Sequence, residues 1–253
     1  MSIFSKPTGR RDFIRKSLAI IPAVSIVRSG LVAAETPPAT EAASAQPASA
    51  SAENAVHEGS SPYHPCYFTA EEWTFLGAAC SRLIPNDENG PGALELGGPE
   101  FIDRQMNGPF GHGSRWYLKG PFFEGPPELG YQSRLTPRDV YRMGIAATDA
   151  HCQSTLGSRR FVELSPKQRD EVLKGLEAGT IVFPDSDSKA FFTLLLQNVK
   201  EGYLADPVHG GNKAMGSWKM IGFPGARADF LDWVDRPGAH YPLGPVSVVG
   251  GRS

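Results

Sequence analysis

Hydrophobic residues recur at helical spacing in several separate stretches, and the first of these is FTAEEWTFLGAACSRLIP at residues 68–85. Thr69 is followed three residues later by Glu72, a capping box that marks the start of a helix. Pro85 ends this helix because proline cannot donate the next backbone hydrogen bond. The apolar face of the predicted helix carries Trp73, Leu76, Gly77, Cys80, Leu83 and Ile84.

Four further stretches predict helices, and most of them open on residues that favour a helix start. Thr136 and Ser165 each precede a proline, which suits a first helical turn because an N–H group there has no intrahelical partner. Asp185 and Asp187 precede the last stretch, where capping a helix explains them better than a calcium loop, which needs more oxygen ligands. These predicted helices span residues 99–106, 136–156, 165–179 and 188–206.

The last predicted helix, at 188–206, is the most apolar of the set. Its hydrophobic face carries Phe192, Leu195, Leu196, Val199 and Tyr203. No stretch shows the sustained alternation that indicates a strand. We therefore predict a mostly α fold, in which a small helical domain is followed by a long irregular C-terminal segment rich in Gly, Pro and aromatic residues.

This C-terminal segment, residues 206–253, has an unusual composition. Fourteen of its 48 residues are Gly or Pro, yet aromatic residues are spread through it. A disordered tail is poor in aromatic residues, so this segment is expected to dock onto something. Its own helical domain and a partner protein are both open as the docking surface. We assign to a partner interface the residues Trp218, Phe223, Phe230, Trp233 and Tyr241.

Composition divides the rest of the chain. Residues 35–62 are rich in Ala, Ser, Pro and Thr and contain no Phe, Trp or Tyr, which predicts a disordered linker. Residues 107–135 show no period and predict an irregular excursion. The predicted parts are therefore a signal at 1–34, the linker at 35–62, a helical domain at 63–205 and the docking segment at 206–253. The net charge of -2, without a basic stripe, argues against nucleic acid as a partner.

The N-terminus carries an export signal. Arg10 and Arg11 are followed by Phe13 and by the apolar run at residues 18–27. This run is too short to span a membrane, which takes about 20 apolar residues. The basic pair, the short apolar run and the small residues of Val32-Ala33-Ala34 resemble a twin-arginine signal and favour it over a basic cytoplasmic tail.

The inventory of catalytic motifs is short. No GxGxxG opens a helix after a strand, no CxxCH is present, and we assign no catalytic, cofactor-binding or metal-binding residue to this chain. The three cysteines leave at least one thiol without an internal partner. Cys80 is expected to be buried or internally bonded. Cys66 and Cys152 are candidates for a disulfide to another chain, with a free structural cysteine as the alternative.

FTAEEWTFLGAACSRLIP, followed by NGPGALELGGPEFID at 89–103, resembles gluconate 2-dehydrogenase subunit 3, the gamma chain of membrane-bound flavin dehydrogenases. GGNKAMGSWKMIGFPGARADF at 210–230 and YPLGPVSV at 241–248 also resemble the C-terminal region of that family. The resemblance covers about residues 67–108 and 190–249.

This resemblance implies a heterotrimer in the periplasm, at the outer face of the bacterial inner membrane. An FAD-bearing large subunit oxidises the substrate, and a multihaem cytochrome c subunit passes the electrons to quinone. The small subunit binds no cofactor, touches the membrane only through the complex, and helps the large subunit to fold and to cross the twin-arginine translocase. Substrate choice lies in the large subunit, so 2-ketogluconate, sorbitol, fructose or glucose are alternatives to gluconate. An independent enzyme and a solitary periplasmic binding module are the alternatives outside the family.

Overall fold

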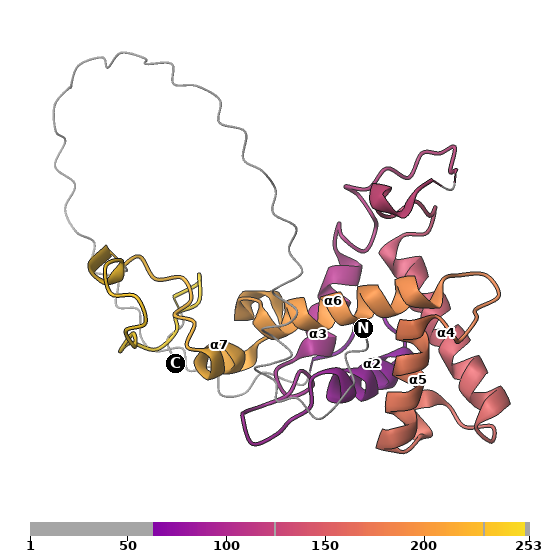
Figure 1. Ribbon diagram of the computed structural model, residues 1–253, viewed down its shortest axis with the longest axis horizontal. Coiled ribbons are helices and arrows are strands. Elements are labelled where there is room, and N and C mark those ends of the chain that lie inside the picture. The colour runs from indigo at the N-terminus through magenta and orange to yellow at the C-terminus, as the bar shows by residue number, and fades with distance from the viewer. Residues whose placement is uncertain (1–62, 124, 230, 251–253) are drawn as a thin grey trace, which may run out of the picture. The chain divides into compact units, whose positions relative to one another are not determined.

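The computed structural model describes residues 63–123, 125–229 and 231–250. They form a helical domain without a β-strand, so the mostly α fold expected from the sequence is confirmed (Figure 1). None of the described helices is long and apolar enough to cross a membrane. The export signal with Arg10, Arg11 and Phe13, and the linker at 35–62, lie outside the described residues. The helices are α2 (Ala70–Leu83), α3 (Gly98–Asn107), α4 (Pro137–Thr155), α5 (Pro166–Ala178), α6 (Ser188–Leu204) and α7 (Gly216–Ile221).

The helix starts follow the local sequence. In α2 the hydroxyl of Thr69 accepts from the backbone N–H of Glu72, whose carboxylate accepts from the N–H of Thr69. The same reciprocal arrangement opens α4 and α5, where a proline occupies the first turn. Asp187 caps α6 by accepting from the N–H of Lys189 at 2.8 Å, as the sequence predicted. These caps satisfy backbone donors that have no partner within the helix.

The helix α6 is the centre of the domain and packs against α2, α3, α4, α5 and α7 (Figure 1). The ring of Phe191 lies near three other aromatic rings, at 6.3 Å from Phe75, 6.0 Å from Tyr141 and 6.3 Å from Phe183. The phenol of Tyr141 donates to the side chain of Asn198 at 3.0 Å inside this core. These two buried polar side chains are thus paired, as an apolar interior requires.

The buried faces of α2 and α6 differ in part from those predicted. Phe75, in α2, is fully buried, whereas Trp73 and Leu83 are only half-buried. In α6, Phe191 is fully buried and Leu196 is half-buried. A single stripe of positions predicts these faces poorly because each of the two helices packs against several others.

Two glycines let α6 approach its neighbours closely. A Cβ atom on Gly144 of α4 would stand 2.3 Å from the ring of Phe191. A Cβ atom on Gly202 of α6 would stand 2.8 Å from the ring of Phe101 in α3. Real Cβ atoms do not come so near to other heavy atoms, so both helix crossings require glycine.

We expect Gly144→Ala to lower the free energy of unfolding by about 1–3 kcal/mol, because the buried ring of Phe191 has no room to move. Gly77→Ala in α2 is the matched control, since its added methyl group meets only ordinary contact with Leu94. That variant is expected to gain about 0.5–1 kcal/mol from helix propensity. Urea denaturation measures both, and equal effects in the two variants would contradict the close crossing.

Candidate partner-binding surfaces

The first part of the C-terminal segment folds back onto the helical domain. Asn212, fully buried, donates through its side-chain amide to the carbonyl of Ala205 and accepts from both the N–H and the hydroxyl of Ser217. Asn212, Ala214 and Met215 all adopt positive φ angles. This local turn starts α7 within a stretch that the sequence predicted to be irregular.

The structure places Trp218, the first of the five predicted interface residues, in the core of its own chain. Only 6% of its surface is exposed. Its indole N–H donates to the carbonyl of Leu204, at the end of α6, at 2.7 Å. Trp218 therefore docks α7 onto the helical domain, which is one of the two alternatives that the sequence left open.

Residues 226–245, the C-terminal loop, leave the domain and return to it at one point. Gly225 and Val246 form an isolated parallel bridge, and Ala226 donates to the carbonyl of Val246 at 2.8 Å. Gly225 has a φ of 72°, and a Cβ atom there would stand 2.2 Å from the carbonyl oxygen of Val246. The base of the loop is therefore closed by a contact that only glycine permits.

A carboxylate at the end of α6 holds the chain just beyond this loop. Asp206 accepts from the hydroxyl of Ser247 at 2.6 Å and from the N–H groups of Val248 at 2.8 Å and Val208 at 3.1 Å. Burial alone raises the pKa of Asp206, but these hydrogen bonds outweigh it and lower the pKa below its usual value. The ionised carboxylate is therefore the form that holds the returning chain.

The C-terminal loop presents apolar side chains to solvent between its fixed ends. Leu231 is 87% exposed and Val234 is 72% exposed. Two of the predicted aromatic residues, Trp233 and Tyr241, meet edge to face with their ring centres 5.3 Å apart, and both are half-buried. Phe223, just before the loop, is exposed, whereas Phe230 lies outside the described residues.

Sequence reasoning missed the aliphatic part of this surface because it considered only the aromatic residues. The signal available was the presence of aliphatic residues in a Gly- and Pro-rich stretch that has no periodicity to bury them. The exposed aliphatic residues in and directly after the loop are Leu231, Val234, Leu243, Val248 and Val249. Where exposed apolar side chains gather into a contiguous patch, they commonly mark a site of protein contact.

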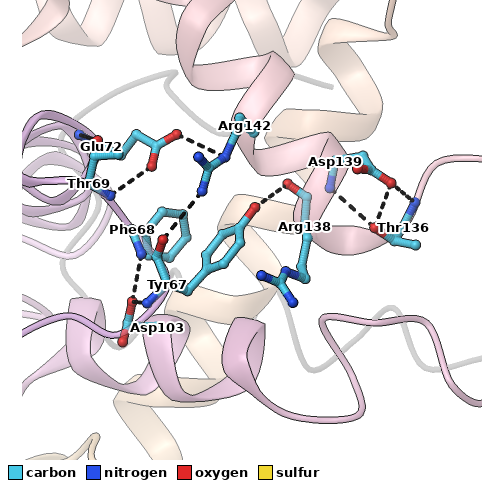
Figure 2. Close-up of polar contacts among 9 residues, drawn as sticks. All are labelled: Tyr67, Phe68, Thr69, Glu72, Asp103, Thr136, Arg138, Asp139 and Arg142. Carbon is cyan, nitrogen blue, oxygen red and sulfur yellow. Dashed lines mark hydrogen bonds and ion pairs between the residues drawn. The ribbon is translucent and has the colours of Figure 1, made fainter.

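The segment before α2 is held by a second carboxylate, Asp103 of α3 (Figure 2). One oxygen of Asp103 accepts from the phenol of Tyr63 at 2.6 Å and from the N–H of Cys66 at 2.8 Å. The other oxygen accepts from the N–H groups of Tyr67 and Phe68, both at 3.0 Å. Asp103 is fully buried, so its charge is stabilised by these four donors rather than by water.

The same segment is fixed to α4 through Tyr67 (Figure 2). The guanidinium groups of Arg138 and Arg142 lie 4.4 Å and 4.8 Å from the centre of its ring. The phenol donates to the carbonyl of Arg138 at 2.8 Å. Arg142 also pairs with Glu72 of α2 at 3.4 Å, so one cluster joins the entering chain to both helices.

The cysteines differ sharply in exposure, and all three are free. Cys80 is the buried thiol that the sequence predicted, and burial raises its pKa to about 12. Cys152 is also buried, which raises its pKa to about 11, and its thiol is not presented to another chain. Cys66 is exposed, so of the two residues proposed for a disulfide to a partner only Cys66 lies at the surface. Within the described ranges, no group of three or more His, Cys, Asp or Glu residues could hold a metal ion.

The sequence of the helical domain matches a known family. The sequence profile of gluconate 2-dehydrogenase subunit 3 matches residues 70–225. The chain belongs to the gluconate 2-dehydrogenase subunit 3 family. Searches of curated proteins and of solved structures gave no match.

Membership of the gluconate 2-dehydrogenase subunit 3 family identifies the chain as a small subunit of a dehydrogenase complex. The matched range begins with α2 and ends at Gly225, where the C-terminal loop begins. The resemblance of residues 241–248 to the family therefore lies outside the match. The donors that bind Asp103 come from residues 63–68, which precede the matched range.

Asp103→Asn is expected to lower the free energy of unfolding by about 2–3 kcal/mol, because the amide group turns a donor toward donors that the carboxylate accepts. Asp235→Asn removes the same charge at an exposed position and serves as the control. Equilibrium denaturation in urea compares the two variants. Equal stability of both would contradict a structural role for the buried carboxylate.

Acid is expected to release the chain that Asp206 holds. A lowered folded-state pKa means that Asp206 contributes stability above its unfolded pKa of about 3.9 and loses it as the pH falls through the lower folded value. Hydrogen exchange of the Val248 amide should therefore lose protection between about pH 5 and about pH 2, after correction for the intrinsic exchange rate. In Asp206→Asn the protection should be weaker and independent of pH across that window, and a wild-type profile in this variant would refute the assignment.

Proposed function

We propose that this chain is the non-catalytic small subunit of a periplasmic, flavin-dependent gluconate 2-dehydrogenase. It assists the folding, the twin-arginine export and the stability of an FAD-bearing large subunit. A multihaem cytochrome c subunit completes the complex at the outer face of the inner membrane. FAD and haem c reside in those partners, and this chain binds neither.

The C-terminal loop is the observation that carries this proposal. The bridge between Gly225 and Val246 joins its two ends to each other, and Asp206 holds the chain directly after Val246 to the end of α6. Between those ends it exposes Leu231 and Val234 to water. Burial of apolar surface contributes a favourable free energy of about 25 cal/mol per Å². A partner that covers these side chains is therefore bound more tightly.

Fixed ends also reduce the cost of binding. A free tail would lose conformational entropy along its whole length when it docks, and that loss would offset much of the gain from burial. The C-terminal loop has already lost part of this freedom in the isolated subunit because its base is closed. The edge-to-face contact between the rings of Trp233 and Tyr241 restricts it further. We therefore propose that the loop presents a preformed contact surface to the large subunit.

Export follows from the position of the signal. Arg10, Arg11 and Phe13 stand in the same chain as the C-terminal loop. A large subunit bound to the loop would cross the membrane with this chain on a single signal. The twin-arginine translocase is therefore a partner during export, and contact with the membrane afterwards is made through the complex.

Two alternatives keep part of this proposal. The large subunit can oxidise a related substrate, such as 2-ketogluconate, sorbitol, fructose or glucose, without any change in the contacts described for this chain. A solitary periplasmic binding module is the alternative outside the complex. Such a module would elute without a partner and bind a small ligand. The isolation experiment below distinguishes it from a complex subunit by the presence or absence of co-eluting chains.

We expect the double variant Leu231→Asp and Val234→Asp to abolish co-purification of the flavin subunit when the tagged protein is isolated from its host. Buried charges at these positions should weaken binding at least about tenfold, since core interface residues commonly contribute about 2 kcal/mol or more. Val182→Asp is the control, because Val182 is 85% exposed and lies between α5 and α6, outside the C-terminal loop. Flavin absorbance and the masses of the co-eluting chains report the result.

Retention of the flavin chain by the double variant would contradict the role of the C-terminal loop. A colourless wild-type protein that elutes alone would contradict the complex itself. The same cell fractions test the export step, and wild-type protein found only in the cytoplasm would refute it. Thermal unfolding of each purified variant shows whether the helical domain is intact.

A further inference from the structure

The chain contains two Asn-Gly pairs, Asn89-Gly90 and Asn107-Gly108, and each is followed by proline. Both asparagines are exposed. Such a pair is chemically labile, because glycine has no Cβ atom to shield its backbone nitrogen from the preceding side chain and adopts most backbone angles. The local sequence and the exposure are alike at the two pairs, so the difference between them lies in how the fold holds each one.

The first pair lies in a tight turn between α2 and α3. The backbone N–H of Asp87 donates to the carbonyl of Gly90 at 3.2 Å, and the N–H of Gly90 donates to the carbonyl of Asp87 at 3.1 Å. The carboxylate of Asp87 accepts from the backbone N–H of Asn89 at 2.8 Å and from its side-chain amide at 3.2 Å. Asp87, Glu88 and Asn89 are all exposed, so opening the turn uncovers none of their side chains.

The second pair lies at the end of α3, where the backbone is held more firmly. Asn107 is the last residue of this helix, and the carbonyl of Gln105 accepts from the N–H groups of Gly108 at 3.2 Å and Gly111 at 3.0 Å. A Cβ atom on the buried Gly111 would stand 2.2 Å from the carbonyl oxygen of Met106. Opening this end of α3 separates close-packed groups, which costs more free energy than opening an exposed turn.

We propose that Asn89 is a site of spontaneous deamidation in the folded protein and that the fold protects Asn107. When the turn opens, the backbone nitrogen of Gly90 attacks the side-chain carbonyl carbon of Asn89 and closes a succinimide ring. The bond from that carbon to Nδ2 breaks, and ammonia leaves with the proton of the Gly90 nitrogen. Water then opens the ring at either carbonyl and leaves aspartate or isoaspartate at position 89.

The reaction removes contacts that hold the turn. The side-chain amide of Asn89, which donates to Asp87, is replaced by a carboxylate that repels the carboxylate of Asp87. Isoaspartate also adds the side-chain methylene carbon to the main chain, which displaces the backbone hydrogen bonds between Asp87 and Gly90. The modified connection between α2 and α3 is therefore looser. This inference does not depend on the role of the chain in a dehydrogenase complex.

The test incubates the purified full chain in slightly alkaline buffer and follows deamidation by tryptic digestion and tandem mass spectrometry. Cleavage after Arg82, Arg104 and Arg115 places the two pairs in separate peptides, residues 83–104 and 105–115. In the folded chain Asn89 should react at least about tenfold faster than Asn107. In the chain unfolded by urea the two rates should be similar, because both pairs have the sequence Asn-Gly-Pro.

Equal rates in the folded chain, or a faster reaction at Asn107, would overturn the proposal. A difference that persists in urea would overturn its structural basis, since neighbouring residues rather than the fold would then decide the rate.

Two variants complete the test. Asn89→Gln is the matched control, because its longer side chain closes a larger ring more slowly, and deamidation of this variant at the wild-type rate would overturn the assignment. Asn89→Asp reproduces one product, and hydrogen exchange of the Gly90 amide should be at least about threefold faster in it than in the wild type. Unchanged exchange would overturn the looser turn.

Discussion

The close approach of α6 to its neighbours is the constraint on which the rest of the domain depends. Gly144 and Gly202 allow the rings of Phe191 and Phe101 to lie against the facing backbone. Those two contacts position α4 and α3 around α6. The helices α2, α5 and α7 also pack against α6, so their placement depends on the same arrangement. An interior packed this closely has little room for a larger side chain at either crossing.

Two carboxylates tie the irregular segments to this helical frame. Asp103 gathers donors from the segment before α2, and Asp206 gathers donors from the chain that returns after the C-terminal loop. Each carboxylate satisfies backbone N–H groups that no helix or sheet would pair. The irregular segments are therefore held by side chains of the helical domain rather than by secondary structure of their own. This arrangement leaves the C-terminal loop free to carry exposed apolar residues.

The sequence predicted the elements that local chemistry determines. Thr69, Thr136, Ser165 and Asp187 mark helix starts through caps that lie within three residues, so a single stretch of sequence contains the whole signal. Contacts between distant parts of the chain gave no such signal. Asp103 meets donors 35 to 40 residues earlier in the chain, and its sequence position resembles that of any helical aspartate.

The buried Trp218 and the exposed aliphatic residues of the C-terminal loop show the same limit. Composition indicated that the segment docks, but the choice between its own domain and a partner depends on three-dimensional packing. Trp218 packs against the end of α6, whereas Leu231 remains exposed. Residues 107–135 likewise show no periodicity, yet the rings of Trp116 and Tyr131 meet there with their centres 4.7 Å apart, and both line a pocket.

The hydrogen bonds to Asp103 also determine how the domain responds to a pulling force. Tension on the chain ahead of Tyr63 would reach hydrogen bonds to one carboxylate of α3 before it reached α2. Four donors within six residues bind that carboxylate. The ring of Tyr67 also contacts the guanidinium groups of two arginines of α4. Pulling from the N-terminal side would therefore strain side-chain contacts before it unwound the first helix. The side-chain contacts of residues 63–68 thus protect α2 from a force applied to the chain before it.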